Sequence, residues 1–400
     1  MAGLASFLAL VVAGVLLWQL HGPGEYVAPR PSPSAAPQAD PGAASSALSA
    51  FVADVHARRT VPGASAEAVV LRNAAALRVT DFSARFVAQS GTVAADGSWS
   101  ADVEYTWRFA GFDARSVTEE VLTRFAPANG HTLRIAGFGG EAGSDDDEKT
   151  PVWLSGAVEV RRTPGTLVLV RGDAKEAGQY AALARMAVTT VRRVLPWPKP
   201  HLVLEVAADE AGLEAALGAT QGSYREVAAV TATVDGSGSP SAPVHVFVNP
   251  DTIGAPDSQG AQVVISHEAT HQATNAATDT DLPIWLKEGF ADYVALRDVD
   301  LPLRTTAGQI LKDVRKNGPP SHLPGEADFN SQADTFGEEY ESAWLACRVL
   351  AEVGGEDGLV EVYDRVEAGA PLARALRSVT GLSVGEFTKA WQEHLSHWAA

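Results

Sequence analysis

Residues 260–275 read GAQVVISHEATHQATN and contain the pattern H-E-x-x-H, which decides how the rest of the chain is interpreted. On a helix, His267 and His271 lie one turn apart on the same face, so both imidazoles can reach one metal ion. Glu268 lies about 100° further round, where its carboxylate can contact a water on that metal without being a ligand. Two neutral imidazoles suit zinc and leave room for a third ligand and a water. A histidine pair at this spacing is by itself more often accidental than functional.

A second stretch, residues 281–293 with the sequence DLPIWLKEGFADY, predicts another amphipathic helix. Sixteen residues separate His271 from Glu288, which is enough chain for a turn and an antiparallel return. Asp292 lies one turn beyond Glu288 on the same face, where it can accept the second N–H of a zinc-bound histidine. Gly289 is costly inside a helix and is explained if two helices approach each other closely at the metal. The two stretches together predict a zinc site.

These stretches resemble the gluzincin metallopeptidases, whose first helix carries H-E-x-x-H and whose second helix carries a glutamate ligand. HEATH and WLKEGFADY are most similar to the Peptidase MA-like family and, more distantly, to the membrane alanyl aminopeptidases. The resemblance extends from about Ala157 to the C-terminal TGLSVGEFTKAWQEHL. It implies one Zn²⁺ per chain, held by His267, His271 and Glu288, with Glu268 as the catalytic base and Asp292 as a carboxylate behind the ligands.

The same resemblance implies further features of the active site. Those families place a downstream tyrosine at the oxyanion, and Tyr340 in FGEEYESAWLACRVL is the best match, although a buried structural tyrosine fits that position equally well. His322 is a weaker oxyanion candidate, because a histidine in a proline-rich loop is more often simply solvated. The strand Val244–Val248 is expected to border the cleft and to pair with extended substrate. The Gly-x-Met-Glu-Asn signature of aminopeptidases is absent from the sequence, which favours an endopeptidase or a hydrolase of another kind over an aminopeptidase.

Residues 151–400 are predicted to form this gluzincin-like domain, with a sheet followed by a helical half, which is an α+β pattern. The expected strands are Ala157–Arg171, Leu202–Ala207, Glu226–Val234 and Val244–Val248. Helices are expected at Ala174–Val194 and Glu210–Leu217, and from Gly260 to the C-terminus.

Residues 48–150 are predicted to form a separate, small α+β domain. Two helical stretches, Leu48–Arg59 and Ala66–Leu77, precede segments such as SWSADVEYTWRFAG, in which polar and apolar residues alternate as in half-buried antiparallel strands. This order of elements resembles a cystatin-like or nuclear-transport-factor-like cone. The acidic run Asp145–Glu148 lacks the alternating ligand spacing of a calcium loop, so it is interpreted as a solvated loop.

The N-terminus is predicted to be a membrane segment followed by a linker. Leu4–Leu20 reads LASFLALVVAGVLLWQL, just long enough to span a bilayer, so residues 1–20 are interpreted as a transmembrane anchor. A cleaved signal peptide stays open as the alternative, but no basic residue precedes the apolar run and no A-x-A site follows it. Residues 21–47, rich in proline, alanine and serine, are interpreted as an extended linker. We expect a single-pass protein of the cell membrane whose catalytic domain is extracytoplasmic.

Composition excludes several classes of partner and site. The chain has 31 basic and 49 acidic residues, a formal charge of −18, and so acidic a surface disfavours nucleic acid. Its lone cysteine, Cys347, excludes an intrachain disulfide and a cysteine-based zinc site. The sequence thus predicts a membrane-tethered zinc peptidase that acts on peptides or proteins. The alternative is a tethered binding module with a structural zinc site, although such a site has no use for the uncoordinated carboxylate of Glu268.

Overall fold

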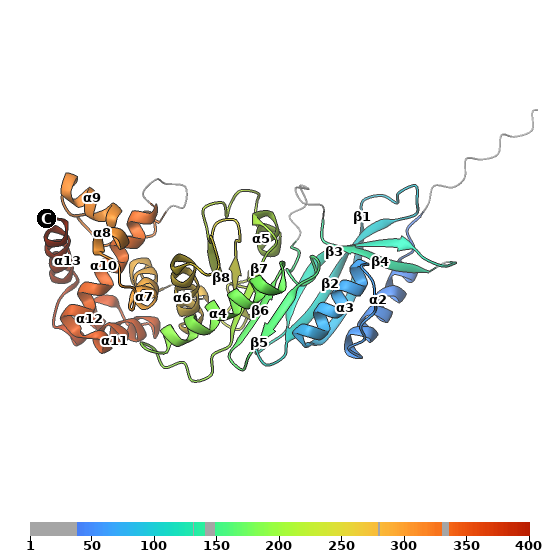
Figure 1. The fold of residues 1–400 in the computed structure, drawn as a ribbon, viewed down its shortest axis with the longest axis horizontal. Helices are drawn as coiled ribbons and strands as arrows, with labels where there is room; N and C mark the ends of the chain where they lie inside the picture. Colours follow the sequence, from blue (N-terminus) through green and yellow to red (C-terminus); the bar gives the residue numbers. More distant parts are fainter. Residues whose placement is uncertain (1–37, 131, 141–148, 279–280, 330–335) are drawn as a thin grey trace, which may run out of the picture.

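The computed structural model describes residues 38–130, 132–140, 149–278, 281–329 and 336–400. The predicted membrane segment, the linker up to residue 37 and the acidic run Asp145–Glu148 lie outside these residues. None of the described helices is both long and apolar enough to cross a membrane. The fold is α+β: an N-terminal antiparallel sheet, a mixed sheet and a mainly helical C-terminal half follow one another along the longest axis (Figure 1).

The N-terminal part consists of two helices and one antiparallel sheet, as predicted. Helices α2 (Pro41–His56) and α3 (Ala66–Leu77) precede strands β1 (Val79–Ser90), β2 (Trp99–Phe109), β3 (Val117–Pro127) and β4 (Leu133–Phe138), which pair in chain order. Alternate residues of β2 are buried, among them Trp99, Val103, Tyr105 and Trp107, because one face of the sheet forms the core.

Helix α2 begins seven residues earlier than predicted, so residues 41–47 belong to this helix and not to the linker. The carboxylate of Asp40 accepts the N–H of Ala43 at 2.9 Å, and Pro41 occupies the first helical turn. Ala44 is fully buried against the sheet. Proline, alanine and serine are common both in linkers and at helix starts, and here the capping residue decides between the two.

The mixed sheet has the strand order β5-β6-β7-β9-β8, with β6, β7 and β9 parallel and an antiparallel strand at each edge. The strands are β5 (Glu159–Arg162), β6 (Thr166–Val170), β7 (Leu202–Val206), β8 (Ala229–Thr233) and β9 (Val244–Val248). The segment predicted as one strand, Ala157–Arg171, is a hairpin, because Pro164-Gly165 turns the chain back.

Strand β9 lies inside the sheet, which corrects the expectation that Val244–Val248 pairs with substrate. Its main chain is hydrogen-bonded to β7 on one side and to β8 on the other. Strand β8, next to β9, is instead one of the two edge strands, and within the described residues no further strand pairs with its outer side.

Both faces of the mixed sheet are buried. Leu167, Leu169, Val203 and Phe247 pack into one core with the N-terminal part, whereas the opposite face packs on α4 (Ala174–Val191) and α6 (Gln259–Ala273). Polar side chains also join the two parts. Asn73 of α3 donates to the carbonyls of Trp153 and Gly156 at 2.8 and 2.7 Å. The N-terminal part and the mixed sheet therefore share a hydrophobic core.

A buried charge cluster lies at this junction. His245 of β9 has its Nδ1 2.6 Å from Glu205 Oε1 of β7, and its Nε2 2.9 Å from Asp113 Oδ1, just after β2. An ionised carboxylate only accepts hydrogen bonds, so both ring nitrogens donate and His245 is an imidazolium. Burial by itself lowers the pKa of His245, but Asp113 and then Glu205 outweigh burial and raise it to about 9.

This cluster should make the stability of the protein depend on pH. Because the folded-state pKa of His245 is raised, its contribution is fully present below about pH 6.5 and is lost as the pH rises through about 9. We expect the parent's free energy of unfolding to fall over this range by on the order of 3 kcal/mol more than that of His245→Gln. Urea unfolding of both proteins at several pH values measures the difference. Parallel pH profiles would contradict the assignment.

The C-terminal half is mainly helical. After α6 it contains α7 (Ile284–Leu296), α8 (Leu303–Thr306), α9 (Gly308–Asn317), α10 (Phe336–Gly354), α11 (Glu356–Glu367), α12 (Leu372–Thr380) and α13 (Val384–Ala399). Gly289 lies where α7 meets α10, since an added Cβ would lie 2.2 Å from the carbonyl oxygen of Ala343. The close helix approach expected from Gly289 is therefore present, but its partner is α10. Cys347 is buried beside it.

Candidate metal centre

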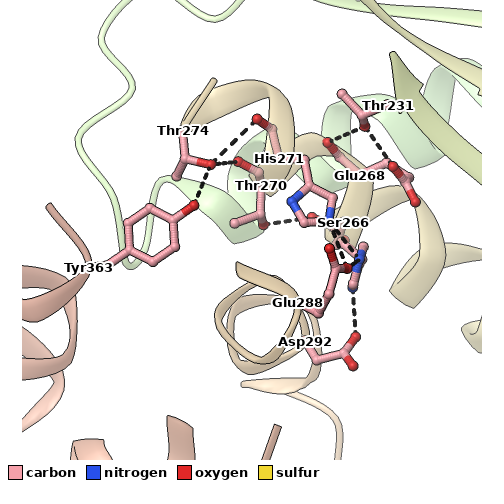
Figure 2. Close-up of polar contacts among 10 residues, drawn as sticks. Thr231, Ser266, Glu268, Thr270, His271, Thr274, Glu288, Asp292 and Tyr363 are labelled. Carbon is pink, nitrogen blue, oxygen red and sulfur yellow. Dashed lines mark hydrogen bonds and ion pairs between the residues drawn. The ribbon is translucent and has the colours of Figure 1, made fainter. Parts of the chain in front are cut away.

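Helix α6 carries the H-E-x-x-H residues and is held in place at both ends. The Ser258 side chain accepts the N–H of Ala261 at 3.1 Å and caps its start. Near its end, the amide of Gln272 donates to the carbonyl of Val244 in β9 at 2.9 Å. The Tyr363 hydroxyl donates to Thr274 Oγ1 at 3.1 Å (Figure 2). These contacts fix the helix against the sheet and against α11.

Three ligand atoms converge between α6 and α7. His271 Nε2 lies 2.9 Å from His267 Nε2, and each nitrogen lies 3.2 Å from Glu288 Oε2. A tetrahedral zinc with bonds of about 2.0–2.1 Å places its ligand atoms about 3.3 Å apart, close to these separations. Two imidazoles and one carboxylate are a common set of zinc ligands, and they leave a fourth coordination position for water. His267, His271 and Glu288 thus form a buried group that could hold a metal ion.

The carboxylates of Asp292, Glu288 and Glu268 favour positive charge at the His-His-Glu group. Asp292 Oδ1 lies 2.7 Å from Nδ1 of His267, whereas Nε2 of the same ring is the nitrogen that lies next to Glu288 and His271. Burial by itself lowers the pKa of His267, but Asp292, followed by Glu288 and Glu268, raises it well above its ordinary value. The pKa of Glu288 is held far below its usual range, because His271 and His267 outweigh the effect of burial. Positive charge at His267 is therefore stabilised.

Glu268 lies beside the group without belonging to it. Its Oε2 lies 2.6 Å from the hydroxyl of Thr231, on edge strand β8 (Figure 2). Sequence reasoning missed Thr231, because a threonine in a short strand gives no signal of its own. Its importance appears only when β8 is placed next to α6.

Tyr340 of α10 also lies next to this centre. Its ring centroid is 6.0 Å from that of His267 and 5.0 Å from that of Phe329. Burial, followed by the nearby carboxylates of Glu288 and Asp292, raises the pKa of Tyr340 well above its ordinary value. Its hydroxyl therefore keeps its proton and can donate a hydrogen bond.

A cleft of about 620 Å³ opens onto these residues. It is lined by residues 226–231, by Val263 and Val264 of α6, and by Lys287 and Tyr340. The cleft is also lined by His267, Glu268, His271, Glu288 and Asp292. His322 is exposed, does not line this cleft, and has its Nδ1 3.1 Å from the carbonyl of Leu323. The structure therefore gathers the predicted residues at one cleft, except for His322.

No protein-family model matches the chain, and no match was found among curated proteins. The structure shows a buried His-His-Glu group that could hold a metal ion, in the helical half of an α+β protein.

Proposed function

We propose that the protein is a zinc metallopeptidase of the gluzincin type, and the observation that carries the proposal is the position of Glu268. Its carboxylate lies at the cleft, next to three convergent ligand atoms and outside the ligand group. A purely structural zinc site is closed by four protein ligands, whereas a catalytic site has three and an open position. The likeness of HEATH and WLKEGFADY to the gluzincins supports the same assignment.

In this proposal each group has one role. Zinc, when bound by His267, His271 and Glu288, supplies a Lewis acid that lowers the pKa of water and polarises a carbonyl. Glu268 takes the proton of the attacking water and passes it to the leaving amine. Tyr340 stays protonated and donates a hydrogen bond to the oxyanion.

Edge strand β8 is the element that we propose to align the substrate. It is one of the two edge strands of the sheet as far as the structure describes the chain, and its residues 229–231 line the cleft. An extended peptide could add to this edge by main-chain hydrogen bonds, which depend little on the side chains of the substrate. Together with the missing Gly-x-Met-Glu-Asn signature, this alignment favours an endopeptidase that acts on peptides or proteins.

Incubation of the purified protein with mixed unstructured peptides tests the proposal. We expect internal cleavage, loss of cleavage when the metal is removed, and its return with one equivalent of zinc. Mass spectrometry of the products distinguishes internal cleavage from removal of terminal residues. Stoichiometric zinc without cleavage of any peptide would overturn the peptidase assignment and favour the tethered binding module.

We also propose that residues 4–20 tether the protein to the cell membrane, with the cleft on the extracytoplasmic side. The support is the apolar sequence and the lack of a cleavage signal after it. The full-length protein should then fractionate with membranes at its full mass. Recovery of a soluble form that begins after residue 20 would favour the signal-peptide alternative.

A further inference from the structure

Thr231 is the hydrogen-bond partner of the Glu268 carboxylate. Its Oγ1 lies 2.6 Å from Glu268 Oε2 and 3.0 Å from the main-chain oxygen of the same residue (Figure 2). Within the described part of the chain, no other side chain or main-chain group forms a hydrogen bond with this carboxylate. Both contacts come from one hydroxyl on the edge strand of the sheet.

The alternation of β8 explains why this hydroxyl faces α6. Val230 and Ala232 pack into the core shared with the N-terminal part, so Thr231 points to the opposite face, where α6 lies. Thr233 points to the same face two residues further on, but its Oγ1 accepts the N–H of Gly238 at 3.0 Å. Of these two threonines, Thr231 is therefore the one that contacts the base.

The contact determines how the base is oriented. The main-chain oxygen and Oε2 of Glu268 both compete for the single proton of the Thr231 hydroxyl, and the hydroxyl donates it to the nearer oxygen, Oε2 at 2.6 Å. The other carboxylate oxygen, Oε1, is then left to accept a proton from water. A glutamate side chain has three rotatable bonds, and a 2.6 Å hydrogen bond from a β-branched residue restricts them. Misplacement of a reacting group by about 1 Å can cost about 10²-fold in rate.

We propose that Thr231 is a positioning residue that orients Glu268 for proton transfer, an inference that rests on the proposed peptidase function. It links the base to the edge strand that would align the substrate. The placement of β8 and the orientation of the carboxylate are thus coupled through one side chain.

The test compares Thr231→Val, which keeps the shape and loses the hydroxyl, with Thr231→Ser, which keeps the hydroxyl. For Thr231→Val we expect kcat to fall about 10- to 100-fold, with KM within about twofold of the parent. Thr231→Ser should stay within about threefold of the parent. Zinc content should stay at one equivalent in both, because Thr231 is not a ligand. Thr233→Val is the matched control, since it removes a hydroxyl from the same strand and face without touching the base.

A second readout does not depend on turnover. A peptide hydroxamate ligates zinc and gives its acidic proton to an adjacent carboxylate, so calorimetry of its binding reports on the orientation of Glu268. We expect weaker binding to Thr231→Val than to the parent, Thr231→Ser and Thr233→Val. Parent-like kcat and hydroxamate affinity in Thr231→Val would overturn the proposal, as would an equal loss in Thr233→Val. If the parent cleaves no peptide, the peptidase assignment fails, and hydroxamate affinity still decides the role of Thr231.

Discussion

Glu268→Gln is expected to lower peptide cleavage by at least about 10²–10⁴-fold while the protein keeps its fold and its zinc. The amide is nearly isosteric with the carboxylate but cannot take a proton from water. The Thr231 hydroxyl can still donate to the amide oxygen, so the side chain should keep its position. Since Glu268 lies outside the ligand group, zinc content should not change. Cleavage rates and elemental analysis of the same preparations measure both.

The matched control for this substitution is Glu226→Gln, which makes the same change at another glutamate that lines the cleft. It alters the charge of the cleft equally but leaves the base intact, so it should not abolish turnover. Cleavage by Glu268→Gln at the parental rate would remove the catalytic assignment. Loss of zinc from this variant would show instead that Glu268 is a ligand.

The metal group could be predicted from the sequence because it depends on local geometry. The spacing of His267 and His271 is fixed by one helix, and that of Glu288 and Asp292 by another. Only the antiparallel return of α7 had to be assumed, and the sixteen intervening residues made it reasonable. The contact of Asp292 with His267 follows from the same helical spacing, because Asp292 lies four residues after Glu288 on one face of α7.

What the sequence did not reveal depends on how distant elements are ordered. Strands β8 and β9 both read as short apolar segments, and no local signal tells which lies at the edge of the sheet. The expectation that Val244–Val248 pairs with substrate is therefore wrong, and nothing in the sequence indicates the role of Thr231. His245 was missed for the same reason, since its carboxylate partners lie 40 and 132 residues away along the chain.

His271→Ala is expected to lower zinc affinity by more than about 100-fold and to abolish cleavage. Loss of a carboxylate that only orients a ligand typically costs about 10–100-fold in metal affinity, and loss of a ligand should cost more. Asp292→Asn supplies that comparison within the same site, because Asp292 contacts the far nitrogen of His267. Competition with a zinc-binding dye gives the affinity of each variant.

The relative zinc affinities of His271→Ala and Asp292→Asn test the roles of the two residues more closely than either affinity alone. If His271 ligates and Asp292 orients, zinc affinity should decrease from parent to Asp292→Asn to His271→Ala. His322→Ala is the control, because this exposed histidine lies away from the cleft and should leave zinc affinity unchanged. A parental zinc affinity in His271→Ala would mean that the metal lies elsewhere. The convergence of the two imidazoles on Glu288 would then be structural, and the role of Glu268 as a base would lose its support.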